Sequence, residues 1–156
     1  MADIQQDLLP WSPPEALLAA LARIPKGTLG DYREALVPLV KHDDDDVREQ
    51  AVRHLFVHLC DDERHEDVVR LLRADRSRNV RRAAAYGVMA SSTVTTRAKD
   101  TTLLASVALD ESEEELVRSA AYDSLLFLCG RADGVQHAKP LSLNEYMDYN
   151  WVRTKL

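Results

Sequence analysis

Apolar residues recur along most of the chain with the spacing of one helix face, and polar or Gly- and Pro-containing turns separate the apolar segments. Over 47–59 the apolar side chains follow an i, i+3, i+4 pattern, which is typical of an amphipathic helix with one buried face. The same pattern predicts further helices over 15–24, 31–40, 67–73, 80–90, 102–109 and 114–129. The sequence therefore predicts an all-α protein.

A short pattern appears three times, each time near the start of a predicted helix: a Val-Arg pair, then an alanine three residues after the arginine. The copies are Val47-Arg48 with Ala51, Val80-Arg81 with Ala84, and Val117-Arg118 with Ala121. They lie 33 residues apart (47 to 80) and 37 residues apart (80 to 117). Self-similarity at this period indicates stacked repeats, because one helical hairpin cannot bury its apolar face without a neighbour.

Turn and capping residues divide the chain into three regions: a polar N-terminal lead-in over 1–10, a helical repeat domain over 11–130, and a C-terminal loop and aromatic capping tail over 131–156. We expect Ser12 to cap the first long helix and Gly130 to end the last one. Pro38 lies inside the second predicted helix, so this helix either kinks or begins near Glu34. The segment 91–96 is rich in Ser and Thr and is expected to be a loop between repeats.

The C-terminal tail differs in composition from the repeats. It places Tyr146, Tyr149 and Trp151 within six positions, and Ser142 is a candidate N-cap for a short helix there. These aromatic side chains are expected either to cover the last repeat or to dock a partner.

The three copies, with Asp46 and Asn79 preceding the first two, resemble the second helix of HEAT repeats. The short period is similar to that of the bacterial HEAT-like, or phycobilisome-lyase-type, subgroup, and the resemblance covers about residues 34–130. It implies a short right-handed α-α superhelix of about three to four helical hairpins. The resemblance is informative about fold rather than function, because such repeats serve scaffolds, lyases and glycosylases alike. Tetratricopeptide and ankyrin repeats have a similar period, but their signatures are missing.

The same resemblance assigns structural roles to part of the pattern. In the family, the Asp or Asn before the valine and the Arg after it form a ladder between successive repeats. The resemblance therefore implies framework roles for Asp46, Arg48, Asn79, Arg81 and Arg118. Leu116 replaces the polar residue in the third copy, so the ladder is expected to weaken there.

Length, composition and charge narrow the functional classes. With 156 residues, 46% hydrophobic and 29% charged, the chain is expected to form one folded domain. The net charge of −6 argues against sequence-independent nucleic-acid binding, although five arginines within 73–82 leave a local basic stripe as an alternative. The two cysteines, Cys60 and Cys129, indicate neither a disulfide scaffold nor a zinc ribbon. Without a visible secretory signal or an apolar run of membrane-spanning length, we expect a cytoplasmic protein.

No motif predicts catalysis, a metal or a cofactor. The cluster His54, His58, Cys60, Asp61, Asp62 and His65 contains plausible zinc ligands, but the two helical histidines have no intervening general-base Glu, and we interpret them as boundary residues. The consecutive aspartates over 43–46 suit a helix N-terminus and lack the spacing of a calcium loop. Neither a Gly-x-Ser-x-Gly elbow nor a Gly-rich phosphate loop is present.

The remaining candidate is a protein-binding face on the second helices of the repeats. Superposing the copies places two columns just beyond the Val-Arg pairs. The first column is Glu49, Arg82 and Ser119, and the second is Arg53, Tyr86 and Asp123. Mixed charge around a tyrosine is typical of a specific protein interface, where Tyr and Arg often dominate the binding energy.

We therefore predict a non-enzymatic protein–protein interaction module that binds one cognate protein, as a bacterial immunity protein or an adaptor does. A basic partner would suit the net charge, because opposite charges steer association. The competing hypothesis is a small HEAT-like enzyme relative of the bilin-lyase or DNA-glycosylase type. A lyase needs a pocket for a tetrapyrrole and a glycosylase needs a basic concave face, and the sequence predicts neither.

Overall fold

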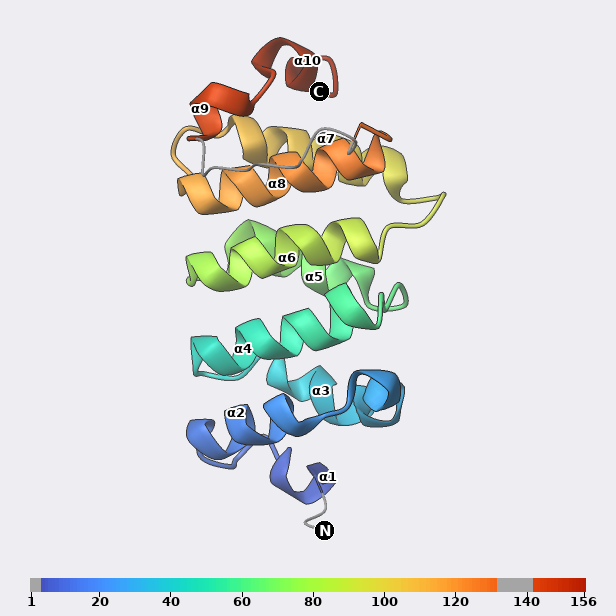
Figure 1. Ribbon diagram of the computed structural model, residues 1–156, viewed down its shortest axis with the longest axis vertical. Helices are drawn as coiled ribbons and strands as arrows, with labels where there is room; N and C mark the ends of the chain where they lie inside the picture. The colour runs from blue at the N-terminus through green and yellow to red at the C-terminus, as the bar shows by residue number, and fades with distance from the viewer. Residues whose placement is uncertain (1–3, 132–141) are drawn as a thin grey trace.

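A computed structural model describes residues 4–131 and 142–156, and within these residues every regular element is a helix. The all-α prediction is confirmed (Figure 1). The elements are α1 (Ile4–Asp7), α2 (Pro14–Arg23), η1 (Lys26–Tyr32), α3 (Arg33–Leu39), α4 (Asp45–Val52), η2 (Arg53–His58), α5 (His65–Ala74), α6 (Arg78–Ala90), α7 (Arg97–Leu109), α8 (Glu115–Leu128), α9 (Leu143–Tyr146) and α10 (Tyr149–Arg153). Among the described residues, no helix is long and apolar enough to cross a membrane.

The helices that carry the three sequence copies lie side by side. α6 packs closely against α4 and η2 on one side and against α8 on the other, and α2 packs against α4. Figure 1 shows this row of α2, α4, α6 and α8 following the long axis of the molecule. Behind it, α5 pairs with α6 and α7 pairs with α8, whereas α5 and α7 barely contact each other. The protein thus has a tightly packed inner row, α4–α6–α8, and a looser outer row that contains α5 and α7.

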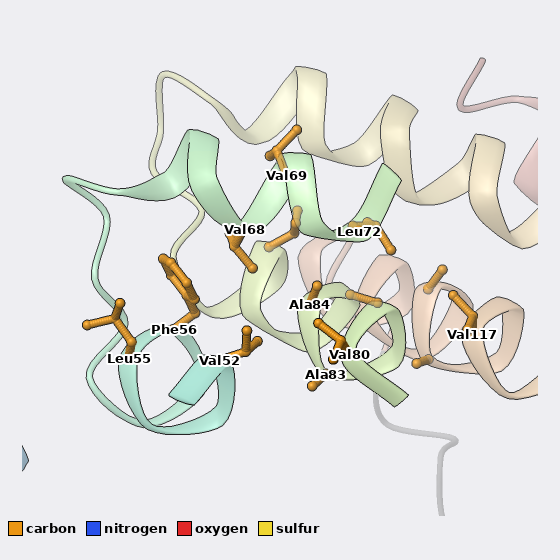
Figure 2. Close-up of a cluster of buried hydrophobic side chains, with 14 of the residues drawn as sticks. Val52, Leu55, Phe56, Val68, Val69, Leu72, Val80, Ala83, Ala84 and Val117 are labelled. Carbon is orange, nitrogen blue, oxygen red and sulfur yellow. The ribbon is translucent and has the colours of Figure 1, made fainter. Parts of the chain in front are cut away.

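The repeated Val and Ala positions form the contact between these rows. Their side chains are at most 1% exposed, and they are Val47, Ala51, Val80, Ala84, Val117 and Ala121. In Figure 2, Val68 and Leu72 of α5 converge with Phe56 of η2 and with Val80 and Ala84 of α6. Alanines let the inner helices approach closely, and the larger side chains of the outer helices fill the remaining space.

Several predicted helix ends need correction. α2 begins at Pro14 with Pro13 as its cap residue, so the prediction of Ser12 as the N-cap is wrong. Seven residues of tight helical turns, η1, precede α3, which begins at Arg33, so its onset is close to the late start expected from Pro38. The outer helix of the third unit begins at Arg97, five residues before the predicted start.

Other ends agree with the capping residues in the sequence. Asp44, in the acidic run, accepts a hydrogen bond from the Val47 N–H at 3.0 Å and caps α4. Gly130 has a φ of 67°, and the Arg131 N–H donates to the Leu126 carbonyl at 2.8 Å, as in a Schellman motif. Ser142 and Glu145 form a reciprocal capping box at the start of α9.

The predicted helix over 47–59 changes its winding half-way. After Val52 it continues as the π-helical segment η2, and Cys60 then takes a left-handed conformation with a φ of 54°. The Asp61 N–H donates to the Leu55 carbonyl at 3.2 Å across this end. The periodicity predicted a helix here but did not distinguish π from α winding, because one inserted residue barely changes the apolar pattern.

The aromatic tail packs against the last repeat. The Tyr122 ring of α8 lies 5.5 Å from the Tyr146 ring and 6.3 Å from the Trp151 ring, between centroids. The Tyr122 hydroxyl accepts a hydrogen bond from the Asp148 N–H at 3.1 Å. α9 contacts α8 and α10 contacts α7, so the two short helices cover the end of the stack (Figure 1).

The arginines of the repeated pattern form a ladder, but with acidic partners other than those predicted. Arg48 makes two hydrogen bonds to the Asp75 carboxylate, both at 2.9 Å, and Arg81 makes two to Glu113 at 2.8 and 2.7 Å. Each acidic partner belongs to the turn of the following hairpin, so these pairs tie successive repeats together. Both arginines thus have structural roles, as expected.

The remaining members of the predicted ladder differ. Asp46 is exposed and takes part in none of the described ion pairs, and neither does the partly exposed Asn79. Arg118 donates to the Ala108 carbonyl at 3.1 Å and lies 3.5 Å from the Tyr149 hydroxyl, with no carboxylate partner in the described chain. The ladder therefore weakens at the third copy, as expected. In the described chain, Arg118 bonds to a carbonyl of its own hairpin where Arg48 and Arg81 bond to carboxylates of the following turn.

Candidate functional site

The six residues predicted to bind a partner lie on the inner row of helices, and we call them the inner-row face. Within each helix, the two members are four residues apart and therefore lie on the same side. Glu49 and Arg53 come from α4 and the start of η2, Arg82 and Tyr86 from α6, and Ser119 and Asp123 from α8. All six are partly exposed, whereas the buried residues of these helices lie at other helical positions.

A shared carboxylate joins the first half of this face across two helices. Glu49 accepts from Arg53 Nε at 3.0 Å and Nη2 at 2.7 Å, and Arg82 Nη2 lies 3.6 Å from the same Oε1 atom. The Glu49 side chain is only 12% exposed, while each guanidinium-bearing side chain is 32% exposed. Two cations therefore share this anion, and Asp123 brings a second carboxylate close to the same cations at Tyr86.

The second half of the face is built around Tyr86. Burial raises the pKa of the Tyr86 hydroxyl above its usual 10.0, and the negative charge of Asp123, with which it is hydrogen-bonded, raises it further. The nearby Arg82 guanidinium acts in the opposite direction. Tyr86 therefore stays a neutral hydrogen-bond donor near neutral pH, anchored to the carboxylate of the next helix.

The C-terminal tail contributes a residue that sequence reasoning did not assign to this face. Tyr146 of α9 is hydrogen-bonded to Ser119, and its pKa is raised, mainly by burial and also by the Asp123 charge. The tail thus extends the face beyond α8. In the sequence, only the aromatic composition of the tail indicated a role for Tyr146. The periodicity could not place Tyr146 beside α8, because the tail lies outside the repeats.

Two large apolar side chains extend the α8 part of the face in both directions. Leu116 is 49% exposed and Phe127 is 60% exposed. They continue the line of Ser119 and Asp123 at spacings of three and four residues, which keeps all four on one side of α8. Sequence superposition could have found Phe127, because it shares a column with Ala90 and Val57 in the earlier copies.

Of the histidine and cysteine cluster weighed as a metal site, only His54 and His58 lie together, with ring centroids 5.9 Å apart. His54 Nε2 lies 3.2 Å from the Leu21 carbonyl, Asp61 accepts from Arg33, and His65 faces away into another contact. His58 and Cys60 are exposed. Burial lowers the pKa of His54, which keeps this imidazole neutral near neutral pH. Among residues 4–131 and 142–156, no three His, Cys, Asp or Glu side chains are grouped to hold a metal ion.

A serine, a histidine and an aspartate lie in line where α5, α6 and α7 meet, an arrangement that the sequence did not predict. His65 Nδ1 is 2.9 Å from Ser91 Oγ, and His65 Nε2 is 2.8 Å from Asp100 Oδ1. Ser91 is 1% exposed, and its hydroxyl donates to the Gly87 carbonyl at 2.8 Å. A nucleophile needs access to its substrate, which this hydroxyl lacks. The network instead joins the end of α6 to the starts of α5 and α7.

No family model matches the chain, and no curated protein or solved structure matches it. The functional interpretation therefore depends on the residues themselves.

Proposed function

We propose that the chain is a short HEAT-like repeat protein, a right-handed α-α superhelix, that acts as a non-enzymatic protein–protein interaction module. Its cognate protein binds the inner-row face. In a bacterial cytoplasm, such a module would serve as an immunity protein that neutralises one toxin, or as an adaptor. The close packing of α4, α6 and α8 and the arginine ladder support the repeat assignment.

One observation carries the binding role: three successive helices present ordered Arg, Tyr and carboxylate side chains on one face. Arg53 and Tyr86 are held by neighbouring carboxylates, so fewer side-chain rotamers have to be frozen on binding than for free surface residues. Such pre-ordered Tyr and Arg residues are the types that most often dominate interface energetics.

The exposed apolar groups add to this argument. Phe127 and Leu116 flank the polar centre on α8 and would each lose a large exposed area on binding. The net charge of −6 favours a partner that is basic overall. The partly exposed guanidinium groups of Arg53 and Arg82 can each bind a carboxylate of that partner.

Affinity capture from a lysate of the source organism tests the proposal. Wild-type protein is expected to retain one stoichiometric basic protein, and the double variant Arg53→Glu/Tyr86→Ala is expected to lose it. Loss of two interface anchors costs about 2 kcal/mol or more, which corresponds to at least about thirtyfold in Kd by titration calorimetry with the purified partner.

Arg70→Glu is the matched control, because Arg70 is exposed on α5 in the outer row and pairs only with Asp67. It should bind as the wild type does. Equal capture by the double variant would reject the inner-row face. A bound pigment or nucleic acid in place of a protein would overturn the proposed function in favour of a lyase or a glycosylase.

A further inference from the structure

The outer row of helices is hollowed between α5 and α7. The larger hollow, of about 740 Å³, runs along α7 and is bordered by the end of α5. A smaller one, of about 260 Å³, adjoins it toward the starts of both helices. Arg73, Lys99 and Leu103 line both hollows, so together they form one continuous depression. We call it the α5–α7 groove.

The floor of the larger hollow is apolar, and the α7 side chains that border it are short. Leu72 and Leu103 are buried beneath it, and Val107 is half-buried at its edge. Along α7, the exposed side chains at every fourth position are small, namely Ala98, Thr102 and Ser106. Because no bulky side chain of α7 fills this space, an apolar chain can lie against the surface of Ala98 and Val107 that is still exposed and remove it from water.

Two cations, one from each helix, line the groove without an anionic partner among the described residues. Arg73 extends from α5 and Lys99 from α7, and both are exposed. In the described part of the chain, neither side chain takes part in a hydrogen bond or an ion pair. Arg70, one turn earlier on α5, is by contrast paired with Asp67 at 3.0 Å. Like charges that share one depression repel each other, and an anion between them removes this repulsion.

Acidic side chains lie at both ends of the groove and so define where an anion can bind. In the smaller hollow, Asp100 is engaged by His65 and Ser92, and the exposed Glu66 lies beside it. At the far end of the larger hollow, Glu113 is engaged by Arg81. Beside it, hydrogen bonds from Ser112 lower the pKa of Asp110, which therefore stays ionised. An anionic group is thus repelled from both ends and attracted to the middle.

We propose that the α5–α7 groove binds a small amphipathic carboxylate of the fatty-acid class, with its headgroup between Arg73 and Lys99 and its acyl chain over Leu72, Leu103 and Val107. The volume of the larger hollow, about 740 Å³, lies in the range of about 300–1,000 Å³ that is usual for small-molecule sites. This site is independent of the proposed protein-binding function, because the groove lies in the outer row and shares no residue with the inner-row face.

A titration of the full, isotope-labelled chain, followed by backbone amide shifts in NMR spectra, tests the site with three probes. Dodecanoate, below its micelle concentration, carries both chain and charge. Dodecyl maltoside carries the same chain with a neutral head, and acetate carries the charge alone. Dodecanoate is expected to shift amides over 98–107 and to bind about tenfold more tightly than either of the others, because only it engages floor and cations together.

Variants separate the two parts of the site. Arg73→Gln/Lys99→Gln should reduce dodecanoate affinity about tenfold to the level of the maltoside, whereas the matched control Arg70→Gln should leave it unchanged. Ala98→Trp should block the floor to both acyl probes without altering the fold, since Ala98 is exposed. Equal affinity for dodecanoate and the maltoside, unchanged affinity in the double variant, or shifts confined to other helices would each overturn the proposal.

Discussion

Removal of each arginine of the ladder is expected to lower the free energy of unfolding by a different amount, and the loss should be largest for the Arg48–Asp75 pair. Both side chains of the Arg48–Asp75 pair are only 6% exposed. The Arg48 guanidinium also donates to the His42 and Asp43 carbonyls at 2.8 and 2.9 Å. Arg48→Ala leaves the Asp75 carboxylate buried with only the Ser77 N–H as a described donor. Breaking such a buried pair costs about 3–5 kcal/mol, a large part of the roughly 5–15 kcal/mol that stabilises a typical domain.

Urea unfolding followed by circular dichroism measures this loss, and two other arginines calibrate it. Arg81→Ala should cost less than Arg48→Ala, because the Arg81 and Glu113 side chains are 17% and 15% exposed. Arg70→Ala should cost about 0–1 kcal/mol, because its pair is on the surface.

The double variant Arg48→Met/Asp75→Leu tests the cause of the loss. Replacing both partners with apolar side chains removes the buried, uncompensated charge, so it should recover most of the stability that Arg48→Ala loses. If Arg48→Ala is no more destabilising than Arg70→Ala, the ladder does not hold the repeats together and the reasoning is refuted.

Three further predictions concern single positions. Gly87→Ala should lower the free energy of unfolding by about 1–2 kcal/mol in urea titrations. The new Cβ would lie 2.7 Å from Val68 Cγ2, and this overpacking outweighs the gain in helix propensity. A stabilised variant would refute this close contact. Cys60→Gly should add about 1 kcal/mol by relieving the left-handed backbone, while Cys60→Ala should add nothing; equal melting temperatures of the two would contradict this. For Glu113, burial raises the pKa, but hydrogen bonds from Arg81 and the backbone outweigh it and lower the pKa below the usual 4.5. The ionised carboxylate therefore stabilises the fold above that pH, and this contribution is lost in acid. The stability difference between wild type and Glu113→Gln should shrink as pH falls through this range, and a constant difference would refute this prediction.

The parts of the fold that repeat could be predicted from sequence, and the parts that occur once could not. The Val-Arg-Ala copies predicted neighbouring inner helices, because a buried column has to be supplied again by each unit. The π-helical η2 and the left-handed Cys60 were not predictable. The η2 segment packs against α3 and α6, and no local residue preference marks its winding or the Cys60 conformation. The acidic partner of Arg48 was also missed, since Asp75 belongs to the next hairpin and pairs with it only through the stacking.

The two candidate sites also differ in how far they could be predicted from the sequence, and the difference has a structural origin. The inner-row face could be read from superposed copies because Glu49, Arg82 and Ser119 occupy one helical position in each repeat. The groove could not, since it arises from unequal packing of the two rows. Gly87 lets α6 approach both Val68 of α5 and Phe56 of η2, while α5 and α7 barely contact each other and leave a groove lined by Arg73 and Lys99. A sequence pattern records which side chains are buried, but it does not give the separation of two outer helices that barely contact each other.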